Sequence, residues 1–262
     1  MCISRIKEKE GLMMSLTEIS LTDVVKRQFR YKIKSYLGVF VSLMILQIIA
    51  IVFSFNGVSS YGSGSDSFSV TISSYSANVV IAFTFIWAFI TAILLTTRAY
   101  RYDDFSFVTN RLSSSLSTLF FLLFACGVAG ISAMLSSYLI KNIIYFFFTD
   151  LTVMAGEAQT APSEFIVGTL ATILYLILFS AVGYFIGALV QLHRFFAVAV
   201  PAITFGTLFV GNQAGIGFVI AWINEFLFRE TSFFIFICKI IVLSGLFFGS
   251  SFLVFNRLEV RQ

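Results

Sequence analysis

The chain has 262 residues and a formal net charge of +4, and 58% of its residues are hydrophobic while only 11% are charged. Soluble domains carry about 25% charged residues, so this composition excludes a soluble globular protein and indicates an integral membrane protein. The apolar runs are continuous and do not alternate with polar residues, which excludes a β-barrel and predicts an all-α fold. The three cysteines lie far apart and His193 is the only histidine, so neither a disulfide framework nor a metal site is expected.

A basic amphipathic segment precedes the first apolar stretch. Its start, Ser15-Leu16-Thr17-Glu18, has the spacing of a capping box, which marks the beginning of a helix. Beyond it, a helical wheel places apolar residues on one half and charged residues on the other, with Lys32 as the exception. We therefore predict an N-terminal tail at 1–14 and an elbow helix at 15–35 that lies in the inner membrane surface. Two interpretations stay open: a basic flank that only sets topology, and an elbow that also touches a cytosolic partner.

Six apolar windows are long enough to span a bilayer, which takes about 20 residues. They cover residues 37–55, 77–97, 116–140, 165–191, 195–213 and 232–255. We predict a six-span domain at 36–256 and a tail at 257–262. Pro201 weakens the fifth window and a glycine-rich stretch ends it, so a re-entrant element is expected at 211–231. The apolar stretch Asn142 to Met154 is also too short to span and is expected to be re-entrant or interfacial.

The distribution of Lys and Arg predicts the orientation. Fourteen of the 17 flank the N-terminus, the second–third connection, the end of the fourth span or the C-terminus. The other three are Lys141, Arg229 and Lys239. Because cytoplasmic flanks are enriched in Lys and Arg, we expect both termini in the cytoplasm.

The spans lack the groups that several functions require. Proton- or ion-coupled transporters usually place Asp, Glu or His within the membrane, whereas Lys239 is the one charge well inside a predicted window. We expect Lys239 to snorkel to the outer surface, with an ion-pair or substrate role as the alternative. No phosphate-binding loop and no catalytic serine, aspartate or metal arrangement is present, so we predict that the chain is not an enzyme. If ATP drives it, a separate subunit binds the ATP.

A charged, aromatic loop at 98–115 completes the pattern. The elbow, the six spans, this loop, the re-entrant element and the basic tail together resemble the ABC-2-type permease subunits of ATP-binding-cassette exporters, with 105–117 and 256–261 as the nearest sequence motifs. The resemblance implies a homodimer, or a heterodimer with a similar permease, in a bacterial plasma membrane. It also implies two cytosolic ATPase subunits that hold ATP and Mg²⁺, so that this chain needs no cofactor and no nucleic acid.

In such permeases the loop after the second span docks on the ATPase as a coupling helix. Carried over to this chain, the resemblance places the ATPase contacts at Arg101, Tyr102, Asp103, Asp104, Phe105, Arg111, Phe29 and Arg30. The alternative is a solvated loop. The import-type E-A-A-x-x-x-G loop is not found, which favours an exporter.

The expected function is export of an amphipathic or hydrophobic substrate. By resemblance to compact permeases of Gram-positive bacteria, the favoured substrate is a peptide such as a toxin or an antimicrobial peptide. Export of a lipid, a glycan or a drug stays open. A non-transporting membrane immunity or scaffold protein is the second hypothesis, and it would not need the Asp103 and Asp104 pair.

Overall fold

The structure is a computed structural model. It describes residues 21–55, 59–65, 68–74, 78–97, 100, 111–147, 162–193, 195–210, 221, 225–227, 229–230 and 232–258. The predicted capping box at Ser15 to Glu18 lies outside the described residues, as do most of the predicted re-entrant element and the last four residues of the tail.

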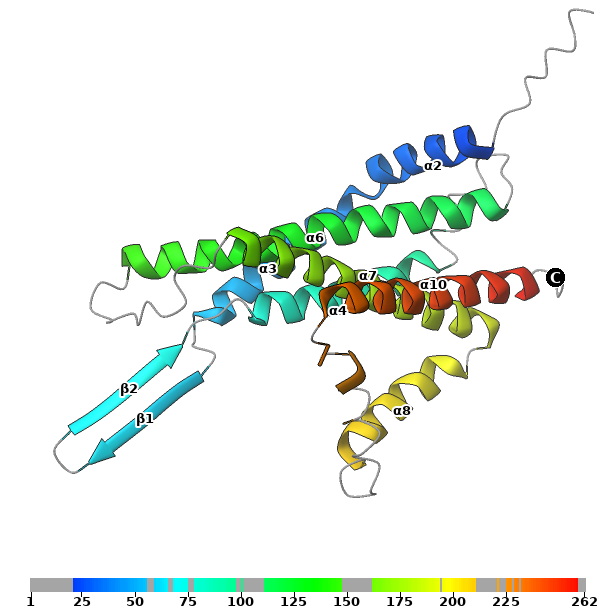
Figure 1. Ribbon diagram of the computed structural model, residues 1–262. Helices are drawn as coiled ribbons and strands as arrows, with labels where there is room; N and C mark the ends of the chain where they lie inside the picture. The colour runs from blue at the N-terminus through cyan, green and yellow to red at the C-terminus, as the bar shows by residue number, and fades with distance from the viewer. Residues whose placement is uncertain are drawn as a thin grey trace, which may run out of the picture.

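Five helices run side by side in an elongated bundle (Figure 1). They are α3 (Leu37–Ser54), α4 (Asn78–Leu95), α6 (Arg111–Phe147), α7 (Pro162–Leu192) and α10 (Phe233–Leu258). Each is long and apolar enough to cross a membrane, since about 20 apolar residues match the thickness of the hydrocarbon core. They coincide with five of the six predicted windows. The prediction of a helical, membrane-embedded protein is therefore confirmed.

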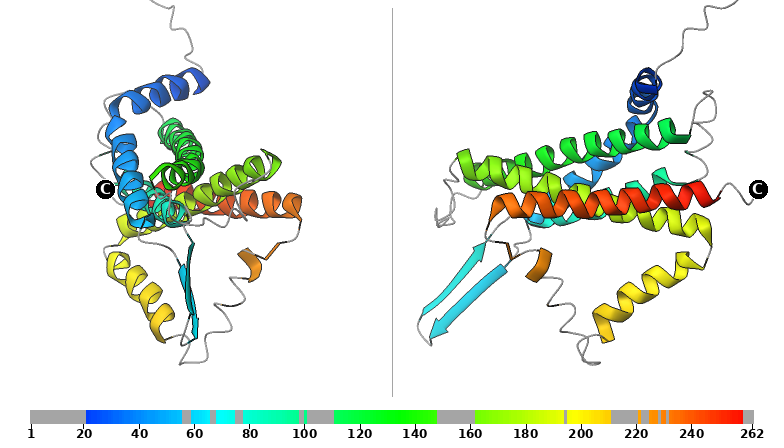
Figure 2. Two further views of the ribbon diagram at one scale, coloured as in Figure 1. Left: turned by 90° about the vertical axis from the view of Figure 1, so that its left-hand side faces the viewer. Right: turned by 45° about the vertical axis from the view of Figure 1, so that its right-hand side comes forward.

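The fifth predicted window forms a shorter helix, α8 (Phe196–Val210), of 15 residues. At 1.5 Å per residue it is about 22 Å long, which is less than the ~30 Å of a hydrocarbon core. It leaves the bundle at an angle (Figure 2). Pro201 lies inside α8 and cannot donate a backbone hydrogen bond. The described residues thus contain five of the six expected spans.

Helices α7 and α10 are parallel, which constrains the chain between them. Tyr175 contacts Phe236 at 5.0 Å between ring centroids, and farther along both helices Tyr184 contacts Phe248 at 5.8 Å. Two parallel neighbours need a connection that returns along their length. Residues 193–232 must therefore carry the chain back along α7, from its end at Leu192 to the start of α10 beside Tyr175.

Helix α6 is longer than expected. It has 37 residues and continues from the predicted end at Ile140 to Phe147. The interpretation of Asn142 to Met154 as a separate re-entrant or interfacial stretch is therefore wrong for its first half. No Gly or Pro interrupts this half, and Ile140 and Ile144 are both buried in a cluster with Val80 and Ala133, which favours continuing the helix.

A two-stranded antiparallel hairpin joins α3 to α4. Strand β1 (Ser59–Ser65) pairs with β2 (Phe68–Ser74) in a register that places Ser59 opposite Ser74 and Ser65 opposite Phe68. We predicted only a connection here, so the all-α prediction holds for the apolar segments and misses this element. The alternating Phe68, Val70 and Ile72 were the available signal for a strand.

Helix α2 (Leu21–Ser35) occupies most of the predicted elbow and lies along α6 (Figure 1). It buries Val25, Gln28 and Lys32, whereas its other charged residues are at least partly exposed. The chain bends at Tyr36, whose amide bonds the Lys32 carbonyl at 2.9 Å, and then continues as α3. The amphipathic helix is thus present at 21–35.

Helix α7 approaches α4 closely at two glycines. A Cβ atom on Gly183 would lie 2.5 Å from the carbonyl oxygen of Phe89, and one on Gly187 would collide with the Thr96 hydroxyl. Small residues allow such close approach in membranes, where packing rather than hydrophobic burial holds helices together. By contrast, a Cβ on Gly245 or Gly249 of α10 would meet nothing within 4 Å.

This difference predicts opposite effects of two alanine substitutions. Gly183→Ala should reduce the free energy of unfolding by about 1–3 kcal/mol, because the backbone of α4 cannot give way. Gly245→Ala should leave it unchanged or raise it by up to about 1 kcal/mol, since alanine is the better helix former. Thermal unfolding of the purified chain in detergent measures both. Equal effects at the two positions would contradict the packing described here.

Candidate functional site

Polar and charged side chains gather in two clusters, one where α2 lies along the start of α6 and the other where the start of α10 packs beside Tyr175 and Leu178 of α7. The elbow cluster consists of Lys32, Tyr36, Tyr100, Ser114 and Thr118. The Lys239 cluster consists of Tyr175, Phe226, Leu227, Glu230 and Lys239. Tyr36 and Tyr100 pack in the same group of side chains as Phe255, near the end of α10, whereas Lys239 lies close to the start of that helix.

In the elbow cluster, a buried lysine connects α2 to α6. Lys32 is only 2% exposed, and its Nζ donates to the Thr118 hydroxyl at 2.6 Å and to the Ser114 carbonyl at 3.4 Å. Thr118 also donates to that carbonyl, at 3.0 Å. A buried ammonium group is costly unless it is hydrogen-bonded, so these contacts determine which side of α2 faces α6. The exception in the helical wheel is thus the residue that holds the helix in place.

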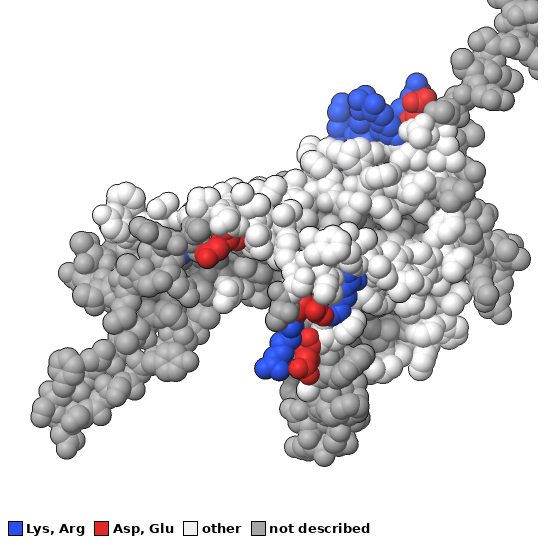
Figure 3. All heavy atoms as spheres, in the orientation of Figure 1, with Lys and Arg blue, Asp and Glu red and all other residues white. Residues whose placement is uncertain are grey.

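The orientation of α2 leaves its basic side uncovered. Lys26, Arg27, Arg30 and Lys34 are exposed, and Figure 3 shows Lys and Arg gathered over α2. The apolar side of the helix packs inward, with the ring of Phe29 edge-on to Phe124 of α6 at 6.1 Å. The elbow therefore presents a positively charged surface at this end of the bundle.

An aromatic contact brings the end of α2 to the start of the predicted coupling loop. The ring of Tyr36 is edge-on to Tyr100 at 4.9 Å and to Phe121 of α6 at 5.7 Å. The Tyr36 hydroxyl donates to the Tyr100 carbonyl at 3.5 Å. Tyr100 directly precedes Arg101, so the end of the elbow lies beside the start of the loop.

The structure describes two of the eight predicted ATPase-contacting side chains. Phe29 is half-buried against α6, and Arg30 is exposed. Arg111 is the first residue of α6, and its side chain lies outside the described part of the chain, as do all atoms of the segment Arg101 to Phe105. The sequence analysis missed the contact between Tyr36 and Tyr100, although the charge of Lys32 on an apolar helix face was a signal that this end of α2 is buried.

The middle of the bundle is held by neutral polar groups. The Gln47 amide of α3 donates to the Thr84 hydroxyl at 3.3 Å and to the Ala129 carbonyl at 3.4 Å. The indole of Trp87 donates to the Ser42 hydroxyl at 3.0 Å. Among the described residues, no three His, Cys, Asp or Glu side chains lie close enough together to hold a metal ion. These contacts can bind helices together, but they offer no ionisable group.

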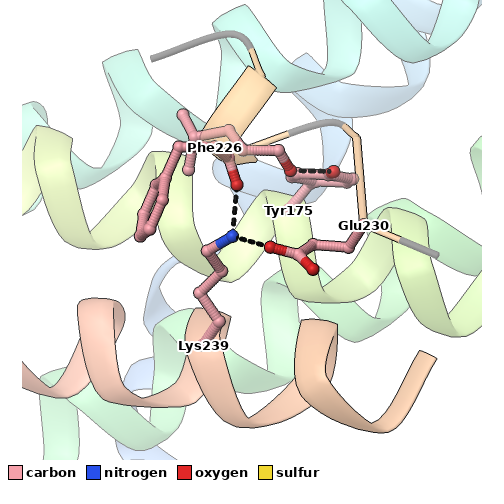
Figure 4. Close-up of polar contacts among 5 residues, drawn as sticks. Tyr175, Phe226, Glu230 and Lys239 are labelled. Atoms are coloured by element: carbon pink, nitrogen blue, oxygen red, sulfur yellow. Dashed lines mark hydrogen bonds and ion pairs between the residues drawn. The ribbon is translucent and has the colours of Figure 1, made fainter. Parts of the chain in front are cut away.

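In the second cluster, Lys239 makes three contacts with one short segment (Figure 4). Its Nζ forms an ion pair with Glu230 and donates to the Phe226 carbonyl, and it lies 3.7 Å from the centroid of the Phe226 ring. Tyr175 of α7 donates to the neighbouring Leu227 carbonyl at 2.8 Å. Snorkelling was the expected behaviour of Lys239, and the structure instead favours the ion-pair alternative.

The elbow cluster predicts a specific sensitivity to loss of one hydroxyl. Thr118→Val removes the 2.6 Å bond to Lys32 and should reduce the free energy of unfolding by about 1–3 kcal/mol, because the ammonium group stays buried. The matched control is Thr169→Val, since the Thr169 hydroxyl bonds only the Phe165 carbonyl of its own helix among the described residues. Thermal unfolding in detergent should separate the two variants. If they are equally stable, Lys32 does not hold α2 against α6.

Comparison with known proteins found no matching protein-family model, no matching curated protein and no matching solved structure, so the function has to be argued from the geometry itself.

Proposed function

We propose that this chain is the transmembrane permease subunit of an ATP-binding-cassette exporter of the ABC-2 type. A separate ATPase subunit drives it, and it moves an amphipathic or hydrophobic substrate out of a bacterial cell. The observation that carries the proposal is the contact of Tyr36 with Tyr100. Through it, the exposed basic elbow and the start of the 98–115 loop lie together at one end of the bundle.

Such an arrangement suits the transmission of a push from a cytosolic partner. The loop is continuous with α4 and α6, and Lys32 fastens α2 to α6 by hydrogen bonds to Thr118 and Ser114. Tyr36 adds a contact to Phe121 of the same helix. A force on the loop would therefore move α2, α4 and α6 as a unit. Coupling of this kind needs contiguous contacts between two sites and an element with two arrangements.

The basic side of α2 offers the partner an electrostatic contact. Arg30 and its exposed neighbours present positive charge on the helix whose end contacts Tyr100, and the sequence that follows Tyr100 contains two acidic residues, Asp103 and Asp104. Complementary charges of both signs steer a partner into one orientation. The ATPase contacts proposed for Phe29, Arg30, Arg111 and the segment Arg101 to Phe105 are those that the family resemblance implies, and the position of α2 beside Tyr100 supports them for Phe29 and Arg30.

The composition of the five apolar helices supports an external source of energy. Glu164, exposed in the first turn of α7, is the one Asp, Glu or His within these five helices. Proton- and ion-coupled transporters place such groups at depth to bind the coupling ion. A bundle without them is better suited to transport driven by ATP hydrolysis in a partner. The same lack of charge favours a hydrophobic or amphipathic cargo over an ion.

The parallel run of α7 and α10 supports a sixth crossing. Residues 193–232 return from the end of α7 to the start of α10 beside Tyr175, and α8 supplies about 22 Å of chain in that connection. In this proposal α8 and the following residues form the fifth span and a re-entrant element. Six crossings place both termini on one side, which the distribution of Lys and Arg assigns to the cytoplasm.

The first test is purification of the tagged full-length chain from its native host in a mild detergent. We expect an ATPase subunit to accompany it at about one copy per permease, and the pair to hydrolyse ATP in reconstituted vesicles. A chain that purifies alone and shows no ATP-dependent activity in any reconstitution would sink the exporter proposal. That outcome would favour a membrane immunity or scaffold protein.

A second test concerns the coupling loop. Asp103→Asn combined with Asp104→Asn should abolish ATPase stimulation or assembly with the ATPase, because it removes the acidic half of the proposed contact. Membrane insertion should not change. Glu164→Gln is the control, since that carboxylate is exposed in the first turn of α7, outside the coupling loop. If the double variant couples as well as the control, the loop is not the ATPase contact.

A further inference from the structure

Residues 225–227 and 229–230, which we call the 225–230 segment, are held by side chains of α7 and α10. Lys239 of α10 donates hydrogen bonds to the Phe226 carbonyl and the Glu230 carboxylate, and Tyr175 of α7 donates one to the Leu227 carbonyl (Figure 4). The Leu227 side chain packs on a buried cluster of Leu178, Phe236 and Ile240. The described position of this segment therefore depends on contacts with both α7 and α10.

The contact of Lys239 is partly shielded from water. The side chains of Lys239 and Glu230 are 11% and 28% exposed. A charge in such surroundings is unfavourable unless it is paired and hydrogen-bonded, and here the ammonium group has an anion, a carbonyl oxygen and an aromatic face as partners. Loss of the segment from its place would leave the ammonium group with none of these three partners.

The same segment contains a second ion pair that serves as a contrast. Arg229 and Glu225 are 3.2 Å apart, but their side chains are 78% and 65% exposed, and both belong to the segment itself. An exposed pair one helical turn apart contributes little to stability. It also does nothing to attach the segment to the bundle.

We propose that Lys239 is the central residue of a latch. Its contacts hold the 225–230 segment against α10 while Tyr175 holds the segment against α7, and the segment leaves the two helices when the contacts of Lys239 are lost. Any role of the latch in transport rests on the proposed exporter function. The attachment of the segment itself is argued from the contacts of Lys239 and Tyr175 alone.

The contacts make the latch asymmetric. Lys239 has three partners in the segment, and Glu230 supplies only one of them; the other two are the carbonyl and the ring of Phe226. Glu230→Gln leaves the Phe226 carbonyl and ring to hold the ammonium group, and Lys239→Met removes every contact at once. Exchange of the two charges would place a carboxylate against a carbonyl oxygen and the negative face of a ring, so it should not restore the closed state.

The test measures how often the segment opens. Leu227→Cys supplies a reporter, because Leu227 is half-buried under the latch, in a full-length chain whose own cysteines are replaced by alanine. We expect a water-soluble maleimide to label the reporter about tenfold faster with Lys239→Met, the ratio expected from loss of a charge-assisted hydrogen bond. Glu230→Gln should give a smaller increase, and the charge exchange should resemble Lys239→Met. Size-exclusion chromatography of each variant checks that it is folded.

The control is Arg229→Gln, which breaks the exposed pair and should leave the labelling rate unchanged. Equal rates for Lys239→Met and Arg229→Gln would overturn the latch, and so would a charge exchange that restores slow labelling. If Lys239→Met fails to fold, the comparison of Glu230→Gln with Arg229→Gln decides in the same way. Because labelling needs no ATPase, faster labelling supports the latch even if the chain proves not to be an exporter.

Discussion

The close approach of α4 and α7 at Gly183 and Gly187 is the contact on which the arrangement of the bundle depends. In a bilayer the lipid is as apolar as the side chains, so helices associate through close packing and hydrogen bonds rather than through burial from water. The two glycines let the backbone of α7 lie against Phe89 of α4 and Thr96, the residue directly after α4. Helix α7 also packs on α6 and α10, so this contact places the centre of the bundle. The neutral hydrogen bonds of Gln47 and Trp87 then fasten α3 to α4 and α6.

Two lysines attach other parts of the chain to the long helices. Lys32, which is buried, fastens α2 to α6, and Lys239, which is partly exposed, fastens the 225–230 segment to α10. Between α3, α4 and α6, the described hydrogen bonds of Gln47 and Trp87 are neutral. A movement of α2 would reach the rest of the bundle through these packed helices. That layout fits a membrane subunit that receives its energy from outside the bilayer, as the proposed exporter function requires.

Different parts of the structure were predictable to different degrees. The five long helices followed from runs of apolar residues, because membrane insertion of a helix is a local property of about 20 residues. The continuation of α6 beyond Ile140 and the hairpin at 59–74 were missed, since the first depends on packing with α4 and the second on pairing between two short, serine-rich segments. For the candidate site, Arg30 lies exposed on α2, but the predicted contact residues around it did not include Tyr36, whose role arises only from its contact with Tyr100.

The sequence by itself determined three things: that the protein is embedded in a membrane, which long segments are helical, and that the basic residues are unevenly distributed along the chain. All three are sums over neighbouring residues. The tertiary structure alone decided that Lys32 is buried, that α7 and α10 run parallel, and that Lys239 has Glu230 and Phe226 as partners. These features depend on contacts between different helices, such as that of Lys32 with Thr118, 86 residues away. Which of the many opposite charges and hydroxyls will meet is set by helix packing, and no local pattern encodes it.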